Sequence, residues 1–148
     1  MVIRSITSGE ARTVRLPVQR EGLPPDSAIL DRDDDPATLH FGAFDGARLI
    51  GVATFFPESC PLQPGLSAWR LRGMATLADM RGKGAGCALI AEGVRVALAS
   101  GATLMWCNAR VSARGFYEKL NFAAVGERFE LPVGGPHYVM IKGLDDPS

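Results

Sequence analysis

Hydrophobic and polar positions alternate along the N-terminal half of the chain with the periods of strands and helices. Residues 2–6 indicate a short first strand, and residues 10–20 form a helical pattern with Thr7 or Ser8 as the N-cap. Residues 22–36 are rich in Pro and Asp, which predicts a loop with at most a short helical turn. The pattern therefore opens as strand, helix and long loop.

Three apolar runs follow this loop. Residues 39–44 and 48–56 flank Asp45-Gly46, a dipeptide that favours a tight antiparallel hairpin. In residues 68–76, apolar and charged positions alternate, so one face of this strand is expected to be buried and the other to carry charge.

The C-terminal half mixes helices and strands. Residues 87–100 have helical spacing, and residues 103–107 are apolar throughout, as in a strand covered on both faces. A strand, helix, strand order predicts parallel pairing between this strand and the one that ends at residue 76. Residues 111–120 read as a further helix, with Asn121 suited to a left-handed residue at its end.

Residues 122–131 and 138–144 predict a terminal hairpin across residues 132–136, and residues 145–148 are expected to fray. These elements give an α/β fold class in a single domain of residues 1–148. We expect a mixed, mostly antiparallel and curved sheet of six or seven strands with helices on both faces.

Composition narrows the function classes. Sixteen basic residues balance sixteen acidic ones, which argues against broad nucleic-acid or anionic-membrane binding. Cys60, Cys87 and Cys107 lack C-x-x-C spacing, so neither a disulfide framework nor a metal site is predicted, and Cys87 is interpreted as a small buried thiol. No export signal or membrane-length apolar run is visible, so we predict a cytoplasmic protein.

Candidate chemistry centres on a glycine-rich turn at the start of the second long helix. Gly82, Gly84 and Gly86 alternate there, and missing side chains let backbone N–H groups converge on an anion. Arg81 and Lys83 add two cations at the same place. The segment therefore predicts a site for a small polyanionic ligand.

Two familiar phosphate-binding motifs do not fit this turn. A nucleoside-triphosphate loop requires Gly-Lys followed by Ser or Thr, and a dinucleotide fold requires G-x-G-x-x-G with an acid about twenty residues on. Instead, Arg81-Gly82-Lys83-Gly84-Ala85-Gly86 resembles the cofactor signature of GNAT acyltransferases. The strand before the turn, the helix after it and residues 113–122 are also similar to that family.

The resemblance implies a GNAT fold, with a central splay between the strands that contain Met74 and Met105, and acetyl-CoA as co-substrate. Backbone groups at Met74, Ala75 and Thr76 would hold the pantetheine arm. Arg110 stands where relatives often have Asn, and Asn108 is close enough to supply the amide contact instead. The full cofactor-binding set implied is Met74, Ala75, Thr76, Arg81, Gly82, Lys83, Gly84, Ala85, Gly86, Asn108, Phe116 and Tyr117.

The implied reaction is direct attack of a primary amine on the acyl thioester, with Tyr117 as the acid that protonates the departing thiolate. Arg70 occupies the position where some relatives carry a carboxylate base. Water or one of four side chains remains as the base: His40, Glu58, Glu130 and His137. Alternatively, an α-amine acceptor needs no base, because its pKa is only about 8.

Two further expectations concern partners and function class. The acceptor is expected to be an amine of unidentified structure. Dimers are frequent in the family, so the resemblance also allows a homodimer. Arg70 and Arg72 are interpreted either as a solvated strand face or as a face toward an acidic acceptor. A non-catalytic acyl-CoA sensor that retains the glycine turn is the alternative function.

Overall fold

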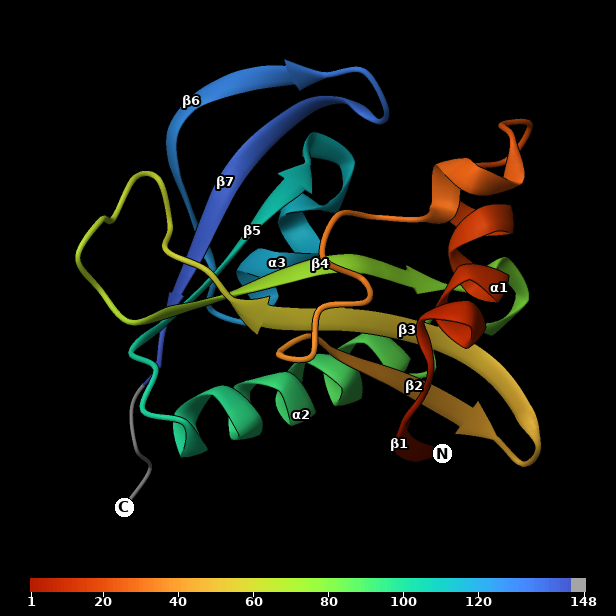
Figure 1. Ribbon diagram of the computed structural model, residues 1–148. Coiled ribbons are helices and arrows are strands. Elements are labelled where there is room, and N and C mark those ends of the chain that lie inside the picture. Colours follow the sequence, from red (N-terminus) through yellow and green to blue (C-terminus); the bar gives the residue numbers. More distant parts are fainter. Residues whose placement is uncertain (145–148) are drawn as a thin grey trace. The chain divides into compact units, whose positions relative to one another are not determined.

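The computed structural model describes residues 1–144 and contains one sheet of seven strands in the order β1-β2-β3-β4-β5-β7-β6 (Figure 1). The elements along the chain are β1 (Val2–Ser5), α1 (Ser8–Gln19), η1 (Pro25–Ala28), β2 (Leu39–Asp45), β3 (Arg48–Pro57), β4 (Ala68–Thr76), η2 (Ala78–Met80), α2 (Ala85–Ala99), β5 (Leu104–Arg110), η3 (Val111–Ala113), α3 (Arg114–Lys119), β6 (Ala123–Leu131) and β7 (Gly135–Gly143). Residues 145–148, which were expected to fray, lie outside the described residues.

The chain forms two compact units. Unit 1 consists of residues 1–56 and 71–93, and unit 2 consists of residues 57–70 together with those from Val94 onward. Each unit is described by itself below. The single domain expected over the whole chain stays a prediction.

Helix α1 in unit 1 begins with a capping box. The Thr7 hydroxyl accepts a hydrogen bond from the Glu10 N–H at 3.1 Å, and the Glu10 carboxylate accepts one from the Thr7 N–H at 3.0 Å. The two bonds satisfy N–H groups that a helix start otherwise leaves free. Pro17 lies inside the helix, which ends two residues later at Gln19.

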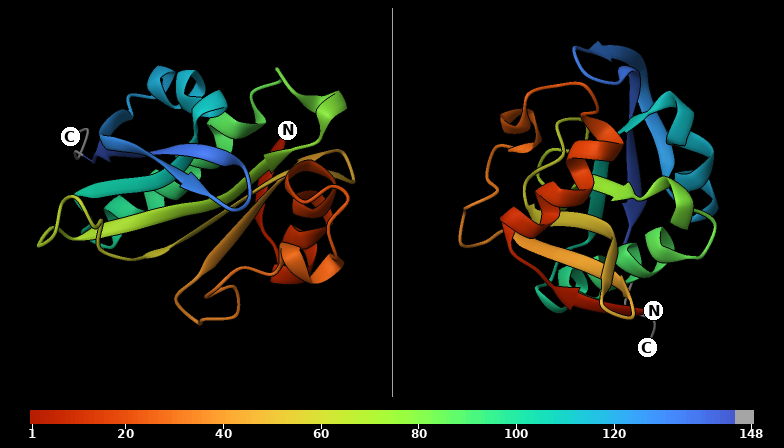
Figure 2. Two further views of the ribbon diagram at one scale, coloured as in Figure 1. Left: turned by 90° about the horizontal axis from the view of Figure 1, so that it is seen from above. Right: turned by 90° about the vertical axis from the view of Figure 1, so that its right-hand side faces the viewer.

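Strand β3 is covered on both faces within unit 1. Val52 packs with Ala11 and Val14 of α1. The next position, Gly51, instead faces α2, because a Cβ there would lie 3.4 Å from Leu89. Successive strand residues point to opposite faces, so α1 and α2 lie on opposite sides of β3, as Figure 2 also shows.

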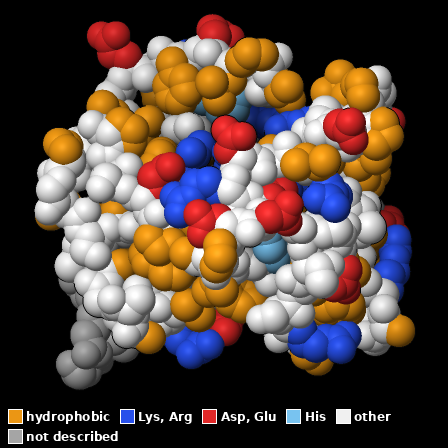
Figure 3. Space-filling model, viewed as in Figure 1, with side chains coloured by type: hydrophobic (Ala, Val, Ile, Leu, Met, Phe, Trp, Pro, Cys, Tyr) orange, Lys and Arg blue, Asp and Glu red, His pale blue; other side chains and the backbone are white. Residues whose placement is uncertain are grey.

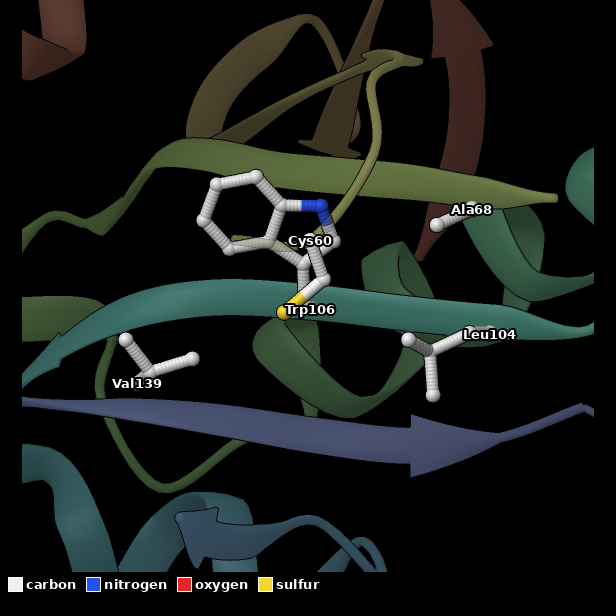
Figure 4. Close-up of a cluster of buried hydrophobic side chains, with 5 residues drawn as sticks. All are labelled: Cys60, Ala68, Leu104, Trp106 and Val139. Atoms are coloured by element: carbon white, nitrogen blue, oxygen red, sulfur yellow. The ribbon is translucent and has the colours of Figure 1, made fainter. Parts of the chain in front are cut away.

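Unit 2 contains the parallel pairing that the sequence predicted. Residues 68–70 of β4 pair in parallel with residues 104–106 of β5, whereas β7 pairs antiparallel with both β5 and β6. The core cluster of this unit is apolar and is drawn in Figure 4: Cys60, Ala68, Leu104, Trp106 and Val139. Trp106 and Val139 rise there from the same face of neighbouring strands.

Most predicted elements are confirmed, with shifts at the C-terminal half. Residues 111–120 do not form one α-helix, because the 3-10 turn η3 precedes the short α3. The terminal hairpin turn is tighter than expected, since β7 begins at Gly135 rather than at Tyr138. Asn121 has φ 68°, which confirms the left-handed residue after the helix.

The fold class is confirmed as mixed α/β with a mostly antiparallel seven-stranded sheet. None of the helices within residues 1–144 is long and apolar enough to cross a membrane. The splay between the strands containing Met74 and Met105 stays a prediction.

Candidate active site

The glycine-rich turn in unit 1 has the backbone geometry of an anion-binding loop. Gly82 and Gly84 have φ 79° and 85°, and α2 begins at the next residue, Ala85. Side chains disfavour this left-handed backbone, so glycine permits the turn to present its N–H groups. All four residues from Arg81 to Gly84 are exposed, which leaves the turn accessible.

The charges around this turn are distributed unequally. Asp79, the single acid near the turn, is held by Arg48 through hydrogen bonds of 2.9 and 3.2 Å. This hydrogen bond from Arg48 lowers the pKa of Asp79. Among residues 1–144, neither Arg81 nor Lys83 forms a salt bridge, although the charge of Lys83 contributes to the lowered pKa of Asp79. Two cations at the start of α2 are therefore available to an anion.

The strand that leads to the turn contains an irregular residue. Gly73 has φ 61° within β4, directly before the predicted arm-binding residues Met74, Ala75 and Thr76. The Met74 carbonyl oxygen accepts a hydrogen bond of 2.7 Å from the Gln19 side chain. Helix α1 thus fixes the backbone at the end of β4.

In unit 2, the pairing of β5 with β7 divides the predicted site residues between two faces. Arg110 lies opposite His137, and Asn108 lies opposite Val139. Directly opposite residues share a face, and alternate residues along a strand do too. Asn108, Arg110 and His137 therefore lie on one face, which is also the face of Trp106.

Helix α3 covers the other face. Arg114 stacks over the Tyr138 ring at 4.9 Å, and Lys142 donates a hydrogen bond of 2.8 Å to the Leu120 carbonyl. Tyr138 and Lys142 alternate with His137 along β7, so α3 and Tyr117 lie on the face opposite Asn108. The structure therefore separates two residues that the sequence assigned to the same cofactor.

Tyr117, the predicted acid, is 7% exposed and contacts Phe116 and Phe122 edge to face, with ring centroids 5.2 and 5.4 Å away. Burial raises the pKa of Tyr117, so its hydroxyl stays protonated throughout the physiological range. Phe116 was expected on the apolar side of this helix, but it is 36% exposed.

His40, one of the base candidates, belongs to a buried network in unit 1. Its Nδ1 lies 2.8 Å from the Thr54 hydroxyl and its Nε2 lies 2.8 Å from the Asp33 carbonyl oxygen. Arg15 donates hydrogen bonds to Asp33 at 2.6 and 3.1 Å and to Thr54 at 2.6 Å. Both ring nitrogens of His40 are therefore engaged in structural bonds.

The pKa of Asp33 follows from this network. Burial opposes ionisation, but the Arg15 guanidinium and the Leu30 N–H donate to the carboxylate, so the pKa lies below its usual 3.8. Sequence reasoning missed this buried ion pair. A signal was present, because Arg15 follows Val14 and lies one helical turn after Ala11, on the stripe that faces the core.

The remaining base candidates differ in their partners. Glu58 accepts a hydrogen bond of 3.0 Å from Arg70, which also stacks over Trp106 at 4.9 Å. Arg70 is therefore not merely a solvated strand residue. Glu130 has a side chain that is 69% exposed, 3.9 Å from Arg128.

The cysteines give one correction. Cys60 and Cys107 are buried, whereas Cys87, expected to be a buried thiol, is exposed in the first turn of α2. Burial raises the pKa of the Cys107 thiol to about 12. Within residues 1–144, no three His, Cys, Asp or Glu side chains are placed to hold a metal ion.

The predicted cofactor residues thus form two groups. Residues 74–76 and 81–86 lie in unit 1, and Asn108, Phe116 and Tyr117 lie in unit 2. Within unit 1, the end of β4 leads through η2 into the glycine turn, so these residues follow one another along a continuous path (Figure 1).

Comparison with known proteins points to one family. Residues 8–122 match the model of the acetyltransferase (GNAT) family. The chain is 36% identical over 142 residues to the uncharacterized N-acetyltransferase YitI of Bacillus subtilis (strain 168), covering 96% of this chain and 95% of YitI.

Solved structures share the fold at low sequence identity. An aminoglycoside 6′-N-acetyltransferase in complex with coenzyme A has a TM-score of 0.79 at 16% identity, covering 100% of this chain and 99% of its own. FeeM, an N-acyl amino acid synthase from uncultured soil microbes, has a TM-score of 0.77 at 15% identity, covering 97% and 90%.

Proposed function

Because the chain belongs to the acetyltransferase (GNAT) family, we propose that it transfers an acetyl group from acetyl-CoA to a primary amine by direct attack on the thioester. Family membership confirms the predicted enzyme class, an N-acetyltransferase, and acetyl-CoA as the acyl donor. The acceptor amine and the roles of individual residues belong to the proposal.

The glycine turn is the observation that carries this proposal. Two left-handed glycines directly before α2 present N–H groups, and the helix dipole favours negative charge at the same point. Arg81 and Lys83 form no salt bridge within residues 1–144, so the pyrophosphate of coenzyme A would not have to displace one. The residues from Arg81 to Gly86 would hold that pyrophosphate.

The other predicted residues would act on the arm and the thioester. Met74, Ala75 and Thr76 would hold the pantetheine through their backbone, and Asn108 would add an amide contact. An N–H near Met74 would stabilise the oxyanion that forms during attack. Phe116 and Tyr117 would flank the thioester.

Tyr117 acts best as a hydrogen-bond donor. A thiolate with a pKa of about 8.5 needs only about 2 kcal/mol of help at neutral pH. Because burial raises the pKa of Tyr117, full proton transfer to this thiolate is uphill, while a hydrogen bond to the developing negative charge remains available. The thiolate can then take its final proton from water.

Calorimetry with coenzyme A at physiological salt tests the cofactor site. We expect binding by the unaltered protein and at least about tenfold weaker binding by the double variant Arg81→Glu/Lys83→Glu, which loses two charge-assisted contacts. The double variant Arg4→Glu/Arg128→Glu, at exposed positions of β1 and β6, changes the net charge by the same amount and serves as the control. Equal binding by all three proteins would contradict the proposed site.

Acetyl transfer is measured separately with acetyl-CoA and a panel of amines. The panel contains an aminoglycoside, free L-amino acids, a peptide with a free α-amine and a peptide whose only amine is a lysine side chain. Mass spectrometry of the acetylated product gives the acceptor class. Coenzyme A binding with no transfer to any amine would instead favour an acyl-CoA sensor.

A further inference from the structure

His137 has a ring whose hydrogen position is fixed by the backbone. Its Nδ1 lies 2.7 Å from the carbonyl oxygen of Gly135. A carbonyl oxygen can only accept, so Nδ1 carries the hydrogen and Nε2 holds the lone pair of the neutral ring. No hydrogen-bond partner of Nε2 is found among residues 1–144, and the residue is only 5% exposed.

The hairpin turn before β7 holds this ring in place. Phe129 of β6 lies opposite His137, and the two rings stack with their centroids 5.9 Å apart. At Gly134, a Cβ would lie 2.6 Å from Arg110 Nε and 3.0 Å from the His137 ring. Only a residue without a side chain leaves room for both groups, so the turn brings Arg110 and His137 together.

The position of His137 on the sheet relates it to a predicted cofactor residue. Asn108 lies two residues before Arg110 on β5. Because Arg110 is directly opposite His137, Asn108 is the diagonal neighbour of His137 on the same face. Such neighbours are about 7–8 Å apart. At this spacing, one amine nitrogen would reach both Nε2 and a group bound at Asn108. Tyr117 lies on the opposite face, so the amine would approach the thioester from the side away from Tyr117.

We propose that His137 is the general base that removes a proton from the acceptor amine, an inference that rests on the proposed acetyl transfer. The other candidates are engaged differently in the structure. His40 uses both ring nitrogens in the core of unit 1, and Glu58 is hydrogen-bonded to Arg70. Glu130 follows Phe129 on β6, so its largely exposed side chain points to the face opposite His137. Figure 3 shows hydrophobic side chains gathered over the β6–β7 hairpin, and these surroundings exclude most water from the buried His137 ring.

The proton balance is complete with the groups named. The acceptor ammonium gives one proton to Nε2, and the neutral nitrogen then attacks the acetyl carbonyl carbon. The carbon–nitrogen bond forms as the carbonyl electrons move to oxygen, and the carbon–sulfur bond breaks as the oxyanion collapses. The nitrogen releases a second proton, one proton reaches the thiolate, and the other leaves His137 for solvent.

Two variants of the ring separate its roles. His137→Asn keeps a donor near the position of Nδ1 for the Gly135 carbonyl oxygen but has no basic nitrogen. His137→Gln places an amide near Nε2 and loses the Nδ1 donor. We expect kcat/KM of both variants for the lysine peptide at pH 7 to fall at least about 100-fold, the lower range of general base catalysis.

Dependence on amine and pH distinguishes a base from a structural residue. The loss should shrink toward pH 10, where a lysine-like amine with a pKa of about 10.4 is partly deprotonated, and should be smaller for a peptide α-amine. Arg110 of β5 is a charged group beside this ring, whereas Glu130 and its partner Arg128 flank Phe129 on β6 and point to the other face. Glu127→Gln, at an exposed position of β6, is the matched control and should change kcat/KM less than about threefold.

A direct measurement of Nε2 does not depend on turnover. Diethyl pyrocarbonate acylates histidine nitrogens that carry an accessible lone pair, and peptide mapping locates the product. The chain contains two histidines, and we expect modification at His137 but not at His40, whose nitrogens are both bonded. Resistance of His137 to this reagent would overturn the proposal.

The possible outcomes separate this proposal from the proposed function. Wild-type turnover combined with an unchanged pH profile in His137→Asn overturns the role of His137 alone. Coenzyme A affinity must also be unaltered in His137→Asn. A misfolded hairpin would lower the free energy of unfolding, and the loss of activity would then not depend on the pKa of the amine. Absence of turnover by the unaltered protein with every amine overturns the proposed function and this role together.

Discussion

Replacing Gly73 by alanine tests how the end of β4 is held in unit 1. The residue has φ 61° and lies beside the buried Arg15 side chain, whose Nε would be 2.7 Å from an added Cβ. The guanidinium cannot move away freely, because Asp33 and Thr54 hold it through hydrogen bonds. Alanine at this position therefore meets both backbone strain and a steric clash.

The expected cost follows from these two effects. A left-handed backbone costs a non-glycine residue about 1–2 kcal/mol, and overpacking a well-filled site costs about 1–3 kcal/mol. Loss of chain entropy in the unfolded state returns about 0.4–1 kcal/mol. We expect Gly73→Ala to lower the free energy of unfolding by roughly 1–4.5 kcal/mol, against the roughly 5–15 kcal/mol typical of a domain.

Two control glycines separate strain from clash in a urea titration. Gly46 has φ 60° but open space around it, so Gly46→Ala should show strain alone. Gly143 has neither a positive φ nor a neighbour within 4 Å, and its replacement by alanine should be nearly neutral. If Gly73→Ala unfolds at the same urea concentration as Gly143→Ala, the packing of Arg15 against β4 is not as described.

Three further predictions follow from the buried groups and the glycine turn. Asp33→Asn should destabilise the protein by about 3–5 kcal/mol at pH 7, because it leaves a buried guanidinium unpaired. Since the folded-state pKa of Asp33 is lowered, its stabilisation is present above about pH 4 and lost as pH falls through the lowered value, so acid unfolding of Asp33→Asn should be less steep. N-ethylmaleimide should modify Cys87 but not the buried Cys60 and Cys107, and coenzyme A should slow the reaction; mass mapping that finds no protection would place the cofactor elsewhere. Tyr117→Phe should lower kcat about 10- to 100-fold with little change in coenzyme A affinity, and an equal loss in both would indicate a packing role instead.

Local signals made much of this fold predictable from the sequence. The α1 cap, the Asp45-Gly46 hairpin and the glycine turn each depend on residues close together in the chain, so their patterns are visible without tertiary contacts. The apolar run of β5 likewise predicted a buried strand, and its residues from Leu104 to Cys107 are all at most 5% exposed.

The features that the sequence did not predict all depend on long-range contacts. Arg15 is buried because Asp33 and Thr54 accept its hydrogen bonds from other elements, and no residue spacing in the sequence predicts that pairing. The shorter turn before β7 placed His137 within a strand, where pairing with Arg110 fixes its neighbours. The two-face arrangement of Asn108 and Tyr117 also depends on strand register, which a single sequence leaves undetermined.

The division of β5 and β7 into two faces affects how this protein can diversify. Side chains that support α3 and those beside His137 alternate along the same strands but do not share neighbours across the sheet. Substitutions well apart and without common partners tend to act additively. Under the proposed role of His137, acceptor preference can therefore change through substitutions beside it while the helix packing on the other face stays the same.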